Sequence, residues 1–161
     1  MIRRFLLGAA LVAASLSRLN CDLVFTLDDP QFTGEFLGCF KGPITDPPGA
    51  EVTIVLETGG GGGGSMVGCF QVTEPRIDAT IAGEVLKDRT QARFDVMPIG
   101  RPLFVLLVTR QPEDGDATEV DLVNESAGGF FRRADDLARC ATPLTCEELG
   151  LAQNFMPGGA P

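Results

Sequence analysis

The stretch Gly34-Glu35-Phe36-Leu37-Gly38-Cys39-Phe40 returns in looser form as Ser65-Met66-Val67-Gly68-Cys69-Phe70. Each stretch places a cysteine between a glycine and a phenylalanine, and each has about the length of one β-strand. Apolar runs of similar length, separated by Gly, Pro and Asp, continue to Ala134. This pattern predicts an all-β domain over residues 34–134.

Apolar and polar residues alternate along most of these runs, as in strands with one buried and one solvated face. Residues 51–57 alternate in this way except at Val55, an apolar residue on the face expected to meet water. The predicted strands cover residues 34–41, 51–57, 66–72, 77–85, 90–97, 103–108, 119–124 and 126–133. About eight closely spaced strands without a helix between them favour a single antiparallel barrel or sandwich.

The tail, residues 135–161, has a different pattern. We expect a helical turn over residues 135–139. Thr145 is a favourable N-cap residue, and the acids Glu147 and Glu148 follow it where negative charge stabilises the start of a helix. The sequence therefore predicts a short C-terminal helix over residues 146–151.

The N-terminus has the charged start and short apolar run of a secretory signal peptide, which we place at residues 1–20. Its apolar run, residues 5–14, is too short to cross a hydrocarbon core of roughly 30 Å as a helix. Export would place the protein in the periplasm, at the outer membrane or outside the cell. Residues 21–33 would then form an N-terminal lead-in to the β domain.

Cys21 sits where a bacterial lipoprotein carries its lipid-modified cysteine. Arg18 and Asn20 depart from the residues usual before such a cysteine, so two interpretations stay open. Either Cys21 carries a lipid and tethers the protein to a membrane, or it is a leftover thiol or a further cystine partner.

Composition excludes several classes of function. The formal charge of −9 becomes −12 without residues 1–20, which contain three arginines and no acid, so nucleic acid is not an expected partner. The chain has no His, which removes Ser-His-Asp and Cys-His catalysis and imidazole metal sites. The glycine run at residues 59–64 lacks the Lys-Ser/Thr pair of a phosphate-binding loop.

From these observations we expect no cofactor, no metal site and no catalytic residue.

In an oxidising compartment Cys39, Cys69, Cys140 and Cys146 would form two disulfides, for which three pairings exist. A local bond between Cys140 and Cys146 would leave Cys39 with Cys69. In a simple meander the strand at 51–57 separates these two by about 9–10 Å, beyond the limit of roughly 7 Å between Cα atoms. Either their strands are direct neighbours, or the bond crosses between sheet layers, or the pairing is different.

The export signal, Cys21 and the glycine-punctuated strands over 34–134 together resemble small bacterial envelope lipoproteins or secreted proteins with a lipocalin-like β-barrel. Gly34-Glu35-Phe36 offers a phenylalanine where the Gly-x-Trp signature of lipocalins has tryptophan. The resemblance is one of layout and carries over no functional residue. It implies a barrel whose interior binds a small apolar ligand.

The first functional hypothesis is therefore an exported, non-enzymatic β domain. A ligand inside the barrel would require a cavity lined by four apolar residues: Val52, Ile54, Phe94 and Val96.

Two alternatives remain. The chain could be a subunit of a cell-envelope assembly that contacts a protein partner through the flank formed by Phe104, Leu106 and Val108. It could also be a carboxylate-dependent hydrolase, for which the candidate acids are Asp78, Glu84, Asp95 and Asp121. Alternation places Asp95 and Asp121 opposite the apolar residues of their strands, so we expect them in solvent.

Overall fold

The computed structural model describes residues 35–59, 64–113, 115–126 and 130–151. The signal peptide, the lead-in and Cys21 expected from the sequence lie outside these residues. The described strands are β1 (Gly38–Thr45), β2 (Pro48–Thr58), β3 (Ser65–Val72), β4 (Ile77–Val85), β5 (Gln91–Pro98), β6 (Phe104–Gln111), β7 (Glu119–Asn124) and β8 (Arg133–Arg139).

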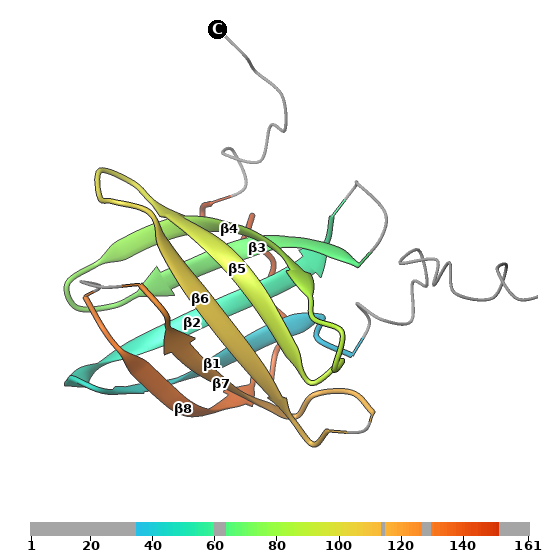
Figure 1. The fold of residues 1–161 in the computed structure, drawn as a ribbon. Helices are drawn as coiled ribbons and strands as arrows, with labels where there is room; N and C mark the ends of the chain where they lie inside the picture. Colours follow the sequence, from blue (N-terminus) through green and yellow to red (C-terminus); the bar gives the residue numbers. More distant parts are fainter. Residues whose placement is uncertain (1–34, 60–63, 114, 127–129, 152–161) are drawn as a thin grey trace, which may run out of the picture.

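Each strand pairs antiparallel with the next in the sequence, and β1 and β8 close the sheet into a barrel (Figure 1). Closure rests on the register Phe40↔Arg139 and Lys41↔Ala138, with a further bridge between Asp46 and Arg133. The expected all-β antiparallel fold is confirmed, and of the two expected architectures the chain adopts the barrel. Among the described residues no helix is long and apolar enough to cross a membrane.

Alternate residues of β1 to β7 point inward and form one core with Ala134 and Leu137 of β8. An eight-stranded barrel is just wide enough for side chains to fill it, and phenylalanines supply much of the volume here. The fully buried ones are Phe36, Phe40, Phe70, Phe94 and Phe131. Two interior glycines mark close strand contacts: a Cβ on Gly68 would lie 1.9 Å from the carbonyl oxygen of Val55, and one on Gly83 would lie 2.0 Å from that of Arg93.

The apolar strand β6 corrects one sequence prediction. Phe104, Leu106 and Val108 were expected to offer a contact flank, but they point into the barrel and are buried. Their neighbours Val105 and Leu107 face outward and are half-buried. Because both faces of β6 carry apolar residues, its sequence pattern does not indicate which face points into the core.

The last strand also differs from the prediction. Residues 135–139, expected to form a helical turn, belong to β8, while residues 126 and 130–132, expected in the last strand, lie outside any strand. The buried residues Ala134 and Leu137 are three apart because a bulge at Asp136, whose φ is 56°, places two residues of β8 opposite Asp121. A spacing of three is typical of helices, which explains the error.

The prediction of a C-terminal helix over residues 146–151 is wrong: residues 146–150 form hydrogen-bonded turns instead. The amide of Leu149 donates to the carbonyl of Thr145 at 3.2 Å, and that of Leu151 to Cys146 at 2.8 Å. Thr145 does cap these turns: the Glu148 amide donates to Thr145 Oγ1 at 3.3 Å, and the Thr145 amide donates to Glu148 Oε2 at 2.8 Å. This reciprocal pair is a capping box.

Candidate functional site

Two disulfides attach the C-terminal segment to the outside of the barrel. Cys39 in β1 bonds to Cys140, and Cys69 in β3 bonds to Cys146, with Cα–Cα distances of 5.3 and 5.7 Å. Residues 140–151, which we name the strap, therefore lie across β1, β2 and β3. The sequence left several disulfide pairings open. Neither the local Cys140–Cys146 bond nor a Cys39–Cys69 bond forms; each cysteine of the strap bonds to a cysteine of the barrel instead.

The register explains why Cys39 and Cys69 do not bond to each other. Both pair with Val55 of the intervening strand β2, so the three residues form a row on the outer face. The strap covers this row, and Val55 is only 2% exposed. Leu144, Leu149 and Leu151 of the strap belong to the same apolar cluster. Val55, the exception to the alternation of its strand, is thus a contact for the strap.

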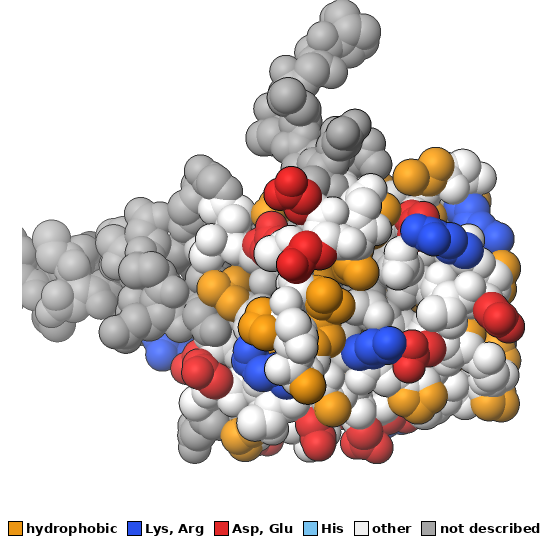
Figure 2. All heavy atoms as spheres, turned by 180° about the vertical axis from the view of Figure 1, so that it is seen from behind, with side chains coloured by type: hydrophobic (Ala, Val, Ile, Leu, Met, Phe, Trp, Pro, Cys, Tyr) orange, Lys and Arg blue, Asp and Glu red, His pale blue; other side chains and the backbone are white. Residues whose placement is uncertain are grey.

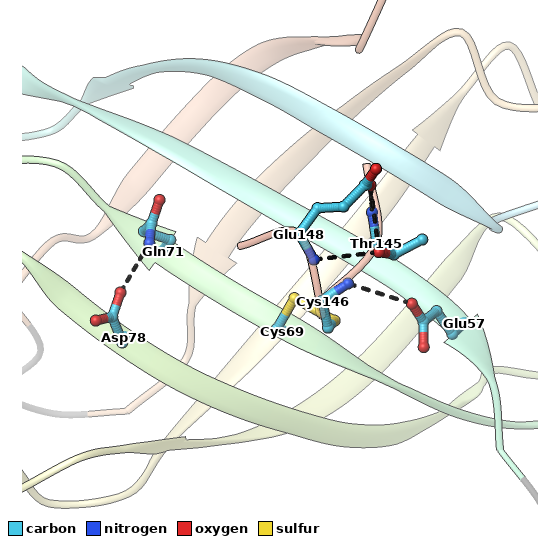
Figure 3. The surroundings of a disulfide bond; sticks show 7 residues. All are labelled: Glu57, Cys69, Gln71, Asp78, Thr145, Cys146 and Glu148. Carbon is cyan, nitrogen blue, oxygen red and sulfur yellow. Dashed lines mark hydrogen bonds between the residues drawn. A yellow bond between two sulfur atoms is a disulfide. The ribbon is translucent and has the colours of Figure 1, made fainter. Parts of the chain in front are cut away.

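Figure 3 shows the second disulfide with the capped turn above it. The Cys146 amide faces Glu57 Oε1 of β2 at 3.5 Å. Beside the disulfide, Gln71 Nε2 of β3 donates to Asp78 Oδ1 of β4 at 2.9 Å. The first contact joins the strap to β2, whereas the second joins β3 to β4 next to the disulfide.

The barrel end where β1 begins is closed by two arginines, and we name it the Arg110 end. Arg110 is 3% exposed; its Nη2 pairs with Glu35 Oε2 at 3.0 Å, and its guanidinium lies 5.8 Å from the centre of the Phe36 ring. Its other nitrogens donate to carbonyls of the flanking connections: Nε to Arg89 at 2.8 Å, Nη1 to Pro112 at 3.1 Å and to Gly115 at 2.7 Å.

The second arginine of this end, Arg139, packs over the Phe40 ring at 5.0 Å and donates to the carbonyls of Ala117 and Leu37 at 2.7 and 3.0 Å. Gly38 makes room for it, since a Cβ there would lie 2.6 Å from Arg139 Nη1. Arg110 is thus buried with its donors satisfied, whereas Arg139 is exposed and covers the Phe40 ring. The tripeptide Gly34-Glu35-Phe36 thus supplies two of the residues that Arg110 contacts.

The opposite end, where β6 begins, is filled by aromatic rings, and we name it the Phe104 end. Phe70, Phe104, Phe130 and Phe131 have ring centres 5.1–6.1 Å apart in stacked, tilted and edge-on contacts. The residues expected to line a ligand cavity, Val52, Ile54, Phe94 and Val96, are buried members of the same packed core.

The four candidate acids lie on the outer face of three strands, and the structure does not bring them together. Asp78 accepts from Gln71 and from Arg76, whose Nε lies 3.0 Å from Asp78 Oδ2. Asp121 of β7 accepts from Gln111 Nε2 and from the amide of Asp136, both at 2.9 Å. Glu84 and Asp95 are exposed on β4 and β5.

The charges near β8 form an ion-paired surface rather than a pocket. Arg133 Nε pairs with Asp135, and hydrogen bonding and attraction to Asp135 raise the pKa of Arg133. In the described part of the chain no three Cys, Asp or Glu side chains form a group that could hold a metal ion. Figure 2, the view from behind, shows acidic, basic and apolar side chains interspersed over that face.

One apolar feature of the surface was not singled out from the sequence. Met97, Ile99 and Leu103 are exposed large hydrophobic residues in and beside the connection between β5 and β6, at 44%, 67% and 55% exposure. We name residues 97–103 the hairpin tip. Its proline- and glycine-rich sequence, Met97-Pro98-Ile99-Gly100-Arg101-Pro102-Leu103, was a signal available beforehand.

The barrel is consistent with the lipocalin-like layout expected from the sequence. Comparisons of the chain with protein families, with curated proteins and with solved structures give no match.

Proposed function

We propose that this protein is an exported, non-enzymatic β-barrel domain that acts at the cell envelope through its outer surface. The observation that carries the proposal is the pair of disulfides that fix the strap to β1 and β3. Disulfides form and persist in oxidising compartments, and the signal-like sequence of residues 1–20 leads to the same location.

Action through the surface is supported by how the interior is used. Aromatic rings pack together at the Phe104 end, Arg110 is buried at the Arg110 end, and buried side chains form one core between them. This packing weighs against a small apolar ligand inside the barrel. The separated positions of Asp78, Glu84, Asp95 and Asp121 weigh against a carboxylate-dependent hydrolase, whose acid and base must converge on one substrate.

The test is the intact mass of the full-length gene product made in a bacterium, measured with and without reduction after separation of cytoplasm and envelope. We expect a product in the envelope or medium that lacks its signal peptide and has Cys39, Cys69, Cys140 and Cys146 oxidised. A mass increase located at Cys21 would show that this residue carries a lipid, which would tether the protein to a membrane. A cytoplasmic product with its first 20 residues and all thiols reduced would refute export.

A further inference from the structure

The exposed large hydrophobic residues of the described chain all belong to the hairpin tip. Figure 1 shows this connection projecting from the barrel at the upper left. Single exposed hydrophobic residues are ordinary, but Met97, Ile99 and Leu103 share one turn. A projecting apolar turn fits insertion into a soft apolar medium, because it extends beyond the end of the barrel (Figure 1).

The backbone of the tip suits such a medium. Pro98 and Pro102 have no N–H group, and the Ile99 amide donates to the carbonyl of Asp78 at 3.1 Å. Gly100 adopts φ 71°, which lets the turn close with a weak 3.4 Å bond from the Arg101 amide to Pro98. Few backbone donors would therefore lose water on entering an apolar phase.

The charges beside the tip are complementary to anionic headgroups. Arg101 is the only charged residue of the tip, and Arg132 lies in the β7–β8 connection at the same end of the barrel. Both are exposed, and within the described residues neither guanidinium has an ion-pair partner. By contrast, Arg93 pairs with Glu125 at 3.2 Å. In a chain of charge −9, one unpaired cation in the apolar turn and a second at the same end of the barrel favour a phosphate-bearing surface.

We propose that the hairpin tip is a membrane-contact site. Met97, Ile99 and Leu103 enter the headgroup region of an anionic bilayer, while Arg101 and Arg132 face lipid phosphates. This rests on the proposed export, which brings the protein beside a membrane. A protein partner fits less well, since a stable interface covers about 800 Å² on each side and the patch comprises three side chains.

The test measures co-sedimentation of the exported protein with vesicles, using a Cys21→Ser background so that no lipid anchor contributes. Vesicles of phosphatidylcholine alone are compared with vesicles that also contain phosphatidylglycerol. We expect stronger binding to the anionic vesicles. The double substitution Ile99→Ser and Leu103→Ser should weaken it by at least about tenfold.

A charge-matched pair of variants tests the arginine. Arg101→Ala should weaken binding to anionic vesicles by about fivefold. Lys87→Ala removes the same charge from an exposed residue at the Arg110 end and should change binding by less than about twofold. Circular dichroism checks that each variant is folded.

Failure to bind either vesicle, or equal binding by the double serine variant, would overturn the membrane site. Self-association that disappears in the double serine variant would instead identify a second copy as the occupant and overturn it as well. A failure of export is a separate result, because it is read from the mass of the signal peptide and the state of the thiols.

Discussion

Two apolar residues outside the barrel core differ greatly in how exposed they are to solvent. Val55 on β2 is covered by the strap and is 2% exposed, whereas Ile99 at the hairpin tip is 67% exposed. In the strapped region the chain supplies its own cover and attaches it with two disulfides. At the tip, no described residue supplies one. An apolar residue outside the core can thus mark a contact, which is internal at Val55 and is proposed to be external at Ile99.

The largest expected effect comes from releasing the strap. Replacing Cys69 and Cys146 together by alanine opens a link across 77 residues, and chain entropy predicts a loss of about 4.5 kcal/mol in the free energy of unfolding. The same pair of changes at Cys39 and Cys140 should cost a similar amount, about 4.5 kcal/mol. Urea unfolding of the oxidised proteins measures both. Stability unchanged by either pair would contradict the covering role of the strap.

The next effect tests the close packing beneath the strap. Gly68→Ala would place a Cβ 1.9 Å from the Val55 carbonyl oxygen, so the two strands must separate. We expect a loss of roughly 3 kcal/mol in unfolding free energy. The matched glycine of the tip is Gly100, whose φ of 71° tolerates asparagine and around which space is open. Gly100→Asn should stay within about 0.5 kcal/mol, and equal losses at both sites would refute the comparison.

A smaller effect separates the covered valine from an uncovered one. Val55→Ala removes two buried methyl groups from the contact with the strap and should cost about 1.5 kcal/mol. Val123→Ala makes the same change on the outer face of β7, where the residue is half-buried, and should cost less than half as much. Thermal or urea unfolding compares the two variants. If Val123 proved the more costly, the strap would contribute little to burying Val55.

The smallest effect is expected at the tip. Ile99→Ser with Leu103→Ser removes exposed apolar surface that packs on little else, so unfolding free energy should change by less than about 0.5 kcal/mol. Chemical denaturation measures it. A large loss would show that the tip supports the barrel itself and is not free to serve a partner.

Much of the barrel was predictable because alternation is a property of each strand alone. Residues 90–97 show it cleanly, and β5 occupies almost the same positions, with Ala92, Phe94 and Val96 buried. β8 was not predicted as a strand because a bulge at Asp136 changes the spacing of its buried residues from two to three. β6 was recognised as a strand, but its faces were exchanged because both are apolar.

The candidate sites were less predictable. The four cysteines expected to form disulfides do so, but their partners depend on where the strap lies. Val55 lies between Cys39 and Cys69 in register, so the expected separation of these two cysteines by one strand is confirmed. The proline- and glycine-rich sequence of the hairpin tip indicates a turn, but the exposure of its apolar residues depends on what packs nearby, which the sequence of a turn does not record.

By itself, the sequence determined the all-β fold class, the approximate positions of the strands and the ability of the four cysteines to form disulfides, because each follows from local residue patterns. Only the tertiary structure decided the closure of β1 on β8, the disulfide partners and the coverage of Val55. These depend on contacts between residues about a hundred positions apart, such as Cys39 and Cys140, separated by 101. Such contacts form where the curvature of the whole sheet brings the two segments together, and no local pattern specifies that curvature.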